Sequence, residues 1–584
     1  MTVAFVESAA VRVRASPWAP TIGRPERILD RAFSGVGLTA AIWAFAASLV
    51  PSLLPRSAWL QGIVSGVTVV VGYGLGTGAQ ALWTYLGVPR LRGRWRTIVL
   101  TTLVGLGQLA ALVAGWRQVG WQNEIRALFG MEPTSPVVWP VILVVTGLVA
   151  GVLLLLARAV RLVARAAIAR FARRLHPRLA LVLAIVLLGV VMWGLWTGVI
   201  VKGFFAGANA IFAPRDTTGS HSVNRPTAPE RSGSASSLAR WEDLGSYGRV
   251  FVRTGPTPAQ LEAVNGAPAK EPIRVYAGLQ SADTVQGRAD LVLAELERTG
   301  AFDRKVLVVA TTTGMGFLDR RSTDSLEYMW NGDTAIAGVQ YSYLPSWISL
   351  LADQEAVVET SRVVFETVRE KWATLPPDHR PALYLYGLSL GSLGVESVLT
   401  SVNIVNEPVD GALMVGPPFF NDMHRRLEAG RDKGSPAYLP VYENGRTVRF
   451  GDEEGGLQGT SEPWGPTRLV YLQHASDPVV FFSTDLAFDR PEWLQDDQRG
   501  PDVSPAMDWL PIVTMWQVLL DMPGAGQVPE GFGHMYSATL QVDAWAAVTR
   551  PPGWTAQRAH RIATLLEARV ASTRSDPSWG LGQG

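Results

Sequence analysis

Five long apolar stretches in the first third of this 584-residue chain constrain its fold more than any other feature. Each is nearly free of charge, and they cover residues 33–54, 59–86, 97–117, 138–160 and 179–201. A helix needs about 20 apolar residues to cross a bilayer. A buried helical core is the alternative, but core helices seldom repeat this length between arginine-rich flanks. The pattern therefore predicts a five-span transmembrane domain over residues 33–213, behind a cytoplasmic tail at 1–32.

The distribution of arginine predicts how these helices are oriented. Arginines cluster before the first stretch, between the second and third, and between the fourth and fifth, and they are scarce in the other two connections. Because positively charged loops stay in the cytoplasm, the N-terminus should be cytoplasmic and everything after residue 213 should lie outside. The apolar stretches contain no carboxylate, whereas an ion-coupled pathway would need one. An anchor or a lipid-access scaffold is therefore favoured over a transporter.

Composition changes after residue 213. Residues 1–213 carry a net charge of +15, which leaves −13 for the remainder. Residues 214–238 are rich in Pro, Ser, Thr and Gly, and this composition is typical of a flexible linker. From residue 239 to 584, apolar runs alternate with helical patterns, and we expect strands at 250–253, 274–278, 306–312, 335–343, 382–386, 412–415 and 468–473. Such alternation predicts a mainly parallel sheet with helices on both faces.

One strand is followed by a Gly-x-Ser-x-Gly sequence. The run Tyr384–Tyr386 leads into Gly387-Leu388-Ser389-Leu390-Gly391, and a helical pattern follows. In this context the serine occupies a sharp strand-to-helix turn that exposes its hydroxyl group. The flanking glycines let the two elements approach closely, because they lack a Cβ. We therefore predict that Ser389 is a catalytic nucleophile.

A serine nucleophile needs a base and an acid that orients the base, and in this arrangement they follow in the order Ser, Asp or Glu, His. Asp477 leaves the late strand at 468–473 and is the predicted acid, with Asp422 as the reserve candidate after the strand at 412–415. His534 lies in a glycine-flanked loop and is the predicted base. The other six histidines are disfavoured by chain order or by their place in a loop, in the linker or on a surface helix.

The oxyanion of the tetrahedral intermediate requires two backbone N–H donors. The amide of Leu390 is one, and the second is expected from Thr313, Gly314 or Met315, of which Thr313 is favoured. The sequence contains no nucleotide-binding glycine motif and no cysteine, and its histidines and carboxylates do not show metal-ligand spacing. We therefore expect no cofactor, no metal and no nucleic-acid partner.

Several blocks resemble the actinobacterial membrane α/β-hydrolases, in which a multi-span N-terminal domain precedes an α/β-hydrolase catalytic domain. The matching blocks are Thr311–Gly316, Leu326–Met329, Gly332–Ala335, Gln340–Trp347 and Gly387–Ser392. The resemblance implies an α/β-hydrolase fold with Ser389 as the nucleophile.

These observations predict a serine hydrolase of esterase or lipase type, anchored in the plasma membrane with its catalytic domain outside the cytoplasm. A lipid or an acylated cell-envelope ester is the expected substrate, because a tethered site meets bilayer-borne molecules at high effective concentration. Two alternatives remain open. The same triad could transfer acyl groups to an alcohol, or the domain could be a non-catalytic part of a membrane transport or assembly system.

Overall fold

The structure is a computed structural model. It describes residues 33–89, 93–171, 186, 189, 224–344, 349–350, 354–401, 408–457 and 462–573.

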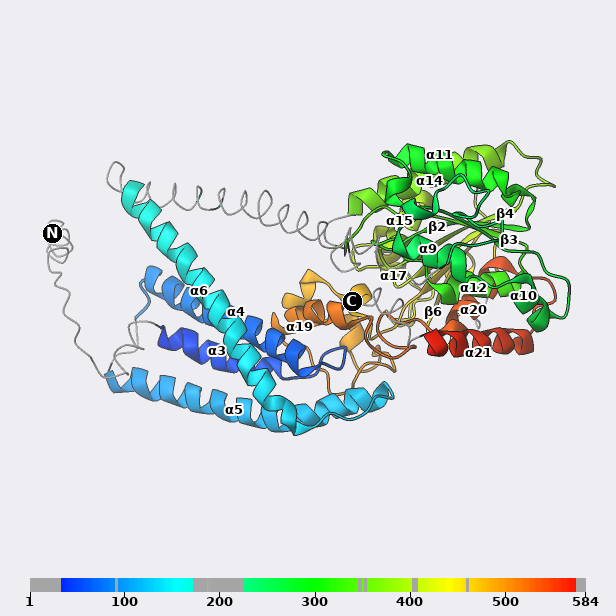
Figure 1. Ribbon diagram of the computed structural model, residues 1–584. Coiled ribbons are helices and arrows are strands. Elements are labelled where there is room, and N and C mark those ends of the chain that lie inside the picture. Colours follow the sequence, from blue (N-terminus) through cyan, green and yellow to red (C-terminus); the bar gives the residue numbers. More distant parts are fainter. Residues whose placement is uncertain are drawn as a thin grey trace.

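The described N-terminal residues form a helical domain (Figure 1). Its helices are α3 (Gly35–Ser48), α4 (Ala58–Tyr85), α5 (Gly93–Leu128) and α6 (Trp139–Phe171). Small residues allow α4 to pack closely against its neighbours. A Cβ at Gly72 would lie 2.4 Å from that of Ala44 on α3, and one at Gly62 would lie 2.6 Å from that of Val145 on α6. Close packing of this kind is common between membrane helices.

Three helices in the described part of the chain are long and apolar enough to cross a membrane, namely Ala58–Tyr85, Gly93–Leu128 and Pro136–Ala166. The prediction of five spans is corrected accordingly. Apart from residues 186 and 189, the span predicted at 179–201 lies outside the described residues. The span predicted at 33–54 contains only the 14 residues of α3, about 21 Å of helix against a hydrocarbon core of about 30 Å. Its last residues, Leu53 and Leu54, pack against the C-terminal domain instead.

Helix α5 exposes apolar side chains over most of its length. Leu109 and Leu112 are exposed, and Trp116 is 81% exposed. A helix on the surface of a soluble domain buries its apolar stripe and shows polar residues to water. The surface of α5 therefore fits contact with lipid.

The described part of the C-terminal domain contains a seven-stranded sheet in which every neighbouring pair is parallel. In spatial order the strands are β1 (Ile273–Ala277), β3 (Thr334–Val339), β2 (Val306–Thr311), β4 (Ala382–Leu388), β5 (Gly411–Val415), β7 (Arg468–Leu472) and β6 (Val448–Gly451). This sheet with its helices confirms the predicted α/β architecture and fits an α/β-hydrolase.

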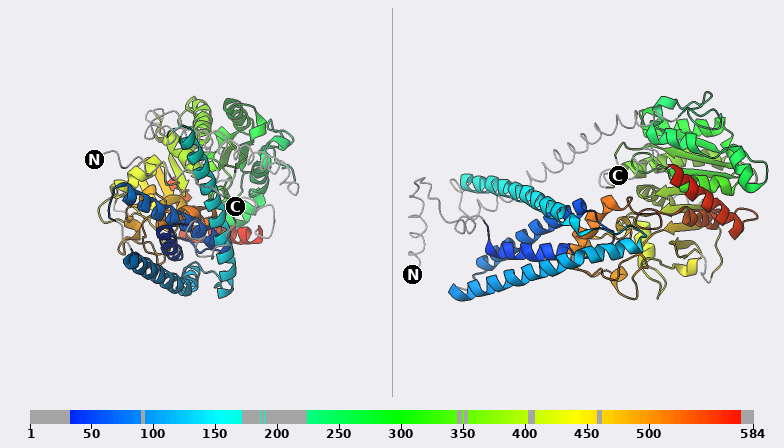
Figure 2. Two further views of the ribbon diagram at one scale, coloured as in Figure 1. Left: turned by 90° about the vertical axis from the view of Figure 1, so that its left-hand side faces the viewer. Right: turned by 60° about the horizontal axis from the view of Figure 1, so that its bottom comes forward.

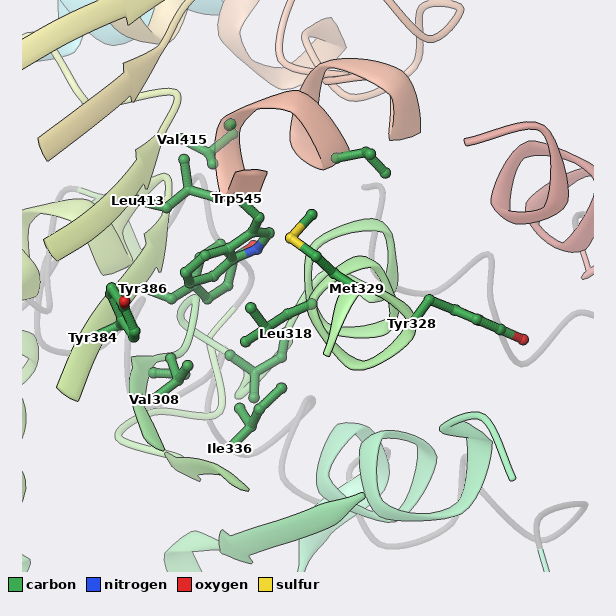
Figure 3. Close-up of a cluster of buried hydrophobic side chains, with 14 of the residues drawn as sticks. Val308, Leu318, Tyr328, Met329, Ile336, Tyr384, Tyr386, Leu413, Val415 and Trp545 are labelled. Carbon is green, nitrogen blue, oxygen red and sulfur yellow. The ribbon is translucent and has the colours of Figure 1, made fainter. Parts of the chain in front are cut away.

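One face of the sheet packs against α12 (Arg320–Met329) and α20 (Ala538–Thr549). Tyr384 and Tyr386 of β4 point to this side, where Tyr386 lies 6.0 Å from Trp545 of α20 between ring centroids. Figure 3 shows both rings within the apolar cluster. Burial on this scale is the main force that holds the layers together.

The opposite face of the sheet packs against α11 (Val285–Arg298) and α14 (Gln354–Ala373), which lie together in Figure 1. Leu383 and Leu385 alternate with the tyrosines of β4 and point to this second cluster. Both faces of the strand are therefore apolar, as expected for a parallel sheet covered on two sides.

One predicted strand is a helix, and one strand was not predicted. Residues 250–253 lie in the helix α9 (Gly245–Thr254), and the edge strand β6 was not predicted. Residues 250–253 form a short apolar run, and such a run does not separate a buried helix from a strand.

The predicted linker also differs. Residues 214–223 lie outside the described residues, but 224–238 pack against the domain. Arg231 is buried, and its backbone forms an isolated parallel β-bridge with Arg274 of β1. Its side chain pairs with Glu271 at 2.6 Å. The Ser232 hydroxyl donates to Glu295 at 2.8 Å. These buried bonds hold the segment in place, although its composition resembles that of a free linker.

Candidate active site

Ser389 lies on a strained turn between β4 and α15 (Leu390–Leu399). Its φ of 54° and ψ of −126° are unfavourable for a residue with a Cβ. Its N–H donates to the Val415 carbonyl of the neighbouring strand at 2.7 Å. A Cβ at Gly387 would lie 2.3 Å from the carbonyl oxygen of Gly391. Gly387 therefore allows the strand and the helix to meet at this angle, whereas a Cβ at Gly391 would lie 2.5 Å from the Thr311 carbonyl oxygen of β2.

Asp477 and His534 contact each other directly. Asp477 follows β7, caps α18 (Pro478–Phe481) and is fully buried. Its Oδ2 is 2.6 Å from His534 Nδ1 and also accepts from the Tyr536 hydroxyl at 2.8 Å, while Oδ1 accepts from the Val479 N–H at 2.9 Å. Burial alone would raise the pKa of Asp477, but the nearby imidazole and these hydrogen bonds together lower it. The carboxylate is therefore held in its charged form.

The second ring nitrogen of His534 is available for proton transfer. Nε2 is buried and has no hydrogen-bond partner among the described residues. The imidazole lies against Gly416, where a Cβ would be 2.4 Å from His534 Cε1. Gly416 directly follows Val415, whose carbonyl binds the Ser389 amide. Ser389 and His534 therefore contact two consecutive residues at the end of β5.

The backbone amides of the two predicted oxyanion donors, Leu390 and Thr313, differ in their hydrogen bonding. Leu390 is the first residue of α15, where backbone N–H groups have no partner within the helix. The Thr313 N–H instead donates to Phe317 O at 3.0 Å within its own turn, and Thr313 O accepts from Gly316 at 2.9 Å. In this conformation the Thr313 amide is already bonded within its own turn.

The reserve acid Asp422 lies at the start of α17 (Asp422–Ala429). Its carboxylate is exposed and pairs with Arg425. The hydrogen bond to His534 is made by Asp477. No group of three or more His, Cys, Asp or Glu side chains within the described ranges is arranged to hold a metal ion.

Residues 273–562 match the model of a family described as "Alpha/beta-hydrolase family", and residues 49–256 match "Alpha/beta-hydrolase family N-terminus". Together the two matches cover most of the chain. The chain belongs to this alpha/beta-hydrolase family. Membership supports a hydrolase-type function. No curated protein and no solved structure was found to match the chain.

A second histidine supports the loop that carries His534. His474 Nδ1 is 2.8 Å from Gly533 O, and its Nε2 is 3.2 Å from Glu453 Oε1. Its ring stacks on Tyr536 at 4.3 Å. Burial alone would lower the pKa of His474, but Glu453 raises it overall. Chain order disfavoured His474 as the base, and nothing in the sequence indicated this supporting role.

A buried carboxyl group also lies behind Ser389. Glu396 of α15 accepts hydrogen bonds from the Tyr471 hydroxyl at 2.9 Å and from the Asn421 side chain at 3.0 Å. Asn421 also donates to Ser392 Oγ, which donates to Ser389 O at 2.7 Å. Burial raises the pKa of Glu396 to about 7, although these hydrogen bonds oppose the shift. Sequence reasoning missed this network, because its members come from separate elements.

Glu396→Gln is expected to change how stability depends on pH. A carboxyl group with a raised pKa stabilises the fold while it is protonated, and this contribution is lost as the pH rises from about 4.5 through about 7. Between pH 5 and pH 8 the free energy of unfolding of the variant should therefore rise by about 2 kcal/mol relative to that of the wild type. Thermal melting at both pH values measures the change, with the exposed Glu355→Gln as control. If variant and wild type differ in stability by the same amount at both pH values, Glu396 does not titrate in this range.

Proposed function

We propose that this α/β-hydrolase is a serine hydrolase that cleaves a lipid or cell-envelope ester through an acyl-enzyme. The observation that supports the proposal most is the 2.6 Å contact between Asp477 and His534, with Nε2 unpartnered among the described residues. A base oriented by a buried carboxylate, together with a serine on a strained turn, is the combination that activates a hydroxyl group.

In the proposed reaction, Ser389 Oγ attacks the ester carbonyl carbon while His534 Nε2 takes the hydroxyl proton. The negative charge on the carbonyl oxygen is stabilised by backbone N–H groups, including that of Leu390. The C–O bond then breaks, and the leaving alcohol takes the proton from His534. Water repeats the sequence on the acyl-enzyme and releases the acid. An alcohol in place of water would give acyl transfer, which product analysis distinguishes.

We also propose that the catalytic domain lies outside the cytoplasm. The ends of the helical domain that contact the catalytic domain are residues 49–57 and the end of α5. Arg94 and Arg96 lie at the opposite end of α5, and Arg158, Arg161 and Arg165 lie along the distal half of α6. Positively charged ends stay in the cytoplasm, so this charge distribution favours an extracytoplasmic active site on a membrane anchor.

A lipid or acylated envelope substrate fits this placement. Anchoring confines the site to the membrane surface, and a bilayer-borne ester is concentrated there. The proposed partners are therefore the bilayer and an ester within it.

A fluorophosphonate probe tests the proposal, because such a probe reacts only with an activated serine. We expect the wild-type chain to be labelled and peptide mapping to locate the label at Ser389. Ser389→Ala should give no label. Absence of labelling in the wild type, or equal labelling of the variant, would rule out an activated serine at this position.

A further inference from the structure

The helical domain packs against the loop that carries the candidate catalytic histidine. We call residues 49–57, between α3 and α4, the junction loop, and residues 531–535 the histidine loop. Leu54 of the junction loop and Phe129 at the end of α5 are buried in one apolar cluster with Met535. Figure 2 shows the helical domain end-on against the catalytic domain.

A buried ion pair fixes the junction loop to the catalytic domain. Arg56 Nε lies 2.7 Å from Asp521 Oδ1, and both side chains are completely buried. The Ser52 hydroxyl donates to the other carboxylate oxygen at 2.5 Å. Gln517 also donates to Val50 O at 2.9 Å. A buried charge that loses its partner is strongly unfavourable, so the two domains are tied together at this point.

This ion pair is linked to the histidine through a short stretch of backbone. Asp521 is the last residue of α19 (Val513–Asp521), which packs against α3 and α4 (Figure 1). One short turn, Met522–Gly524, follows it. The next residue, Ala525, accepts the backbone N–H of His534 at 2.9 Å. A shift of Asp521 would therefore move the carbonyl group that holds His534.

The helical domain also contacts the histidine loop directly. The ring of Phe129 stacks on Phe532 with 4.3 Å between centroids and 19° between planes. A Cβ at Gly533 would lie 3.2 Å from Leu54 Cδ2. On the other side, the Gly533 N–H donates to Ser476 Oγ at 2.9 Å. The histidine loop is therefore held between the helical domain and the rest of the catalytic domain.

We propose that Arg56 and Phe129 are positioning residues for the candidate catalytic histidine, so that the helical domain takes part in the chemistry as well as anchoring the enzyme. The inference rests on the proposed function. Catalytic groups must be held close to their productive geometry, and a displacement of about 1 Å can cost about 10²-fold in rate. A histidine loop whose contacts come partly from another domain depends on that domain for its position.

The test uses the full chain in detergent with a short, water-soluble ester, so that delivery of substrate by the membrane does not contribute. Turnover is divided by the number of sites titrated with fluorophosphonate. A variant that only unfolds part of the population loses titrated sites, whereas a misplaced histidine lowers turnover per site. Phe129→Leu keeps most of the apolar volume and removes the ring stack. Its matched control is Trp116→Leu on the same helix, where the ring is exposed.

We expect Phe129→Leu to lower kcat per titrated site about tenfold, with KM within about twofold of wild type. Trp116→Leu should match the wild type. Arg56→Gln should lower kcat per site at least as much, and Arg56→Lys should recover part of the loss. If Arg56→Gln does not fold, Phe129→Leu decides alone. A kcat per site within twofold of wild type for Phe129→Leu would overturn the inference and leave the proposed function intact, whereas an unlabelled wild type would instead remove the proposed function.

Discussion

Asp477→Asn is expected to lower the rate of ester hydrolysis about 10⁴-fold while the fold is preserved. The reason lies in the donors around the carboxylate. Oδ1 accepts from the backbone N–H of Val479, and Oδ2 accepts from His534 and Tyr536. A carboxylate satisfies all three donors, but an amide has only one acceptor oxygen.

The fixed N–H of Val479 determines how the new side chain is oriented. Because a backbone donor cannot reverse its role, the asparagine oxygen should remain on Val479 and the NH₂ group should face His534 Nδ1. His534 Nδ1 would then have to accept a hydrogen bond from the NH₂ group, which places the ring proton on Nε2. An imidazole protonated at Nε2 cannot take a proton from Ser389, so the base is present but in the wrong tautomer.

Two controls separate this effect from a general loss of charge. Asp422→Asn removes the exposed carboxylate that pairs with Arg425 and should leave kcat/KM within about twofold, as expected for most surface changes. Tyr536→Phe removes one donor to Asp477 and should cost about 1 kcal/mol in the transition state, about fivefold in rate. If Asp422→Asn lost more activity than Asp477→Asn, the acid would have been assigned to the wrong residue.

The parallel sheet could be predicted from the sequence because its central strands are buried on both faces. Residues 306–311 and 382–386, for example, form runs of apolar and aromatic residues that few other structures accommodate. Helix α12 could not be predicted in this way. Its polar residues are buried, and Asp324 and Glu327 each lie 2.6 Å from Arg274 of β1. Because Arg274 lies 50 and 53 positions from these two residues in the sequence, their pairing leaves no local periodic pattern that would predict the helix.

The apolar run at 33–54 shows the same limit in the helical domain. Hydropathy alone predicts that the run continues through the membrane. It stops as α3 because Pro51 cannot continue a helix and because Ser52 and Arg56 find their partner, Asp521, far along the chain. Length and composition indicate where a helix can cross a bilayer, but not which of its residues another domain will bind.

The candidate triad could be predicted by chain order, because Ser389, Asp477 and His534 follow the ends of recognisable elements or lie in a glycine-flanked loop. The second oxyanion donor could not. Whether the Thr313 N–H points inward depends on a turn that closes on Phe317, and the glycine-rich sequence permits several such turns. Backbone donors carry no signature in the side chains.

Gly387→Ala is expected to disable the nucleophile through backbone sterics alone. A Cβ at this position would lie 2.3 Å from Gly391 O, 2.4 Å from Gly391 C and 2.7 Å from Ser392 N. All three atoms belong to the backbone of α15, so no side chain can rotate to make room. The helix must move away from the strand, and Ser389, which joins them, must move with it.

This displacement should be visible in two measurements. Opening the turn should lower the rate of fluorophosphonate labelling by about 10²-fold and destabilise the domain by about 1–3 kcal/mol, as overpacking usually does. Gly465→Ala is the matched control, because its nearest neighbour would be Arg446 O at 3.4 Å, an ordinary contact; it should leave both quantities nearly unchanged. A wild-type labelling rate in Gly387→Ala would mean that the serine does not depend on the close approach of β4 and α15. The strained φ of Ser389 would then have to be maintained by its bond to Val415 alone.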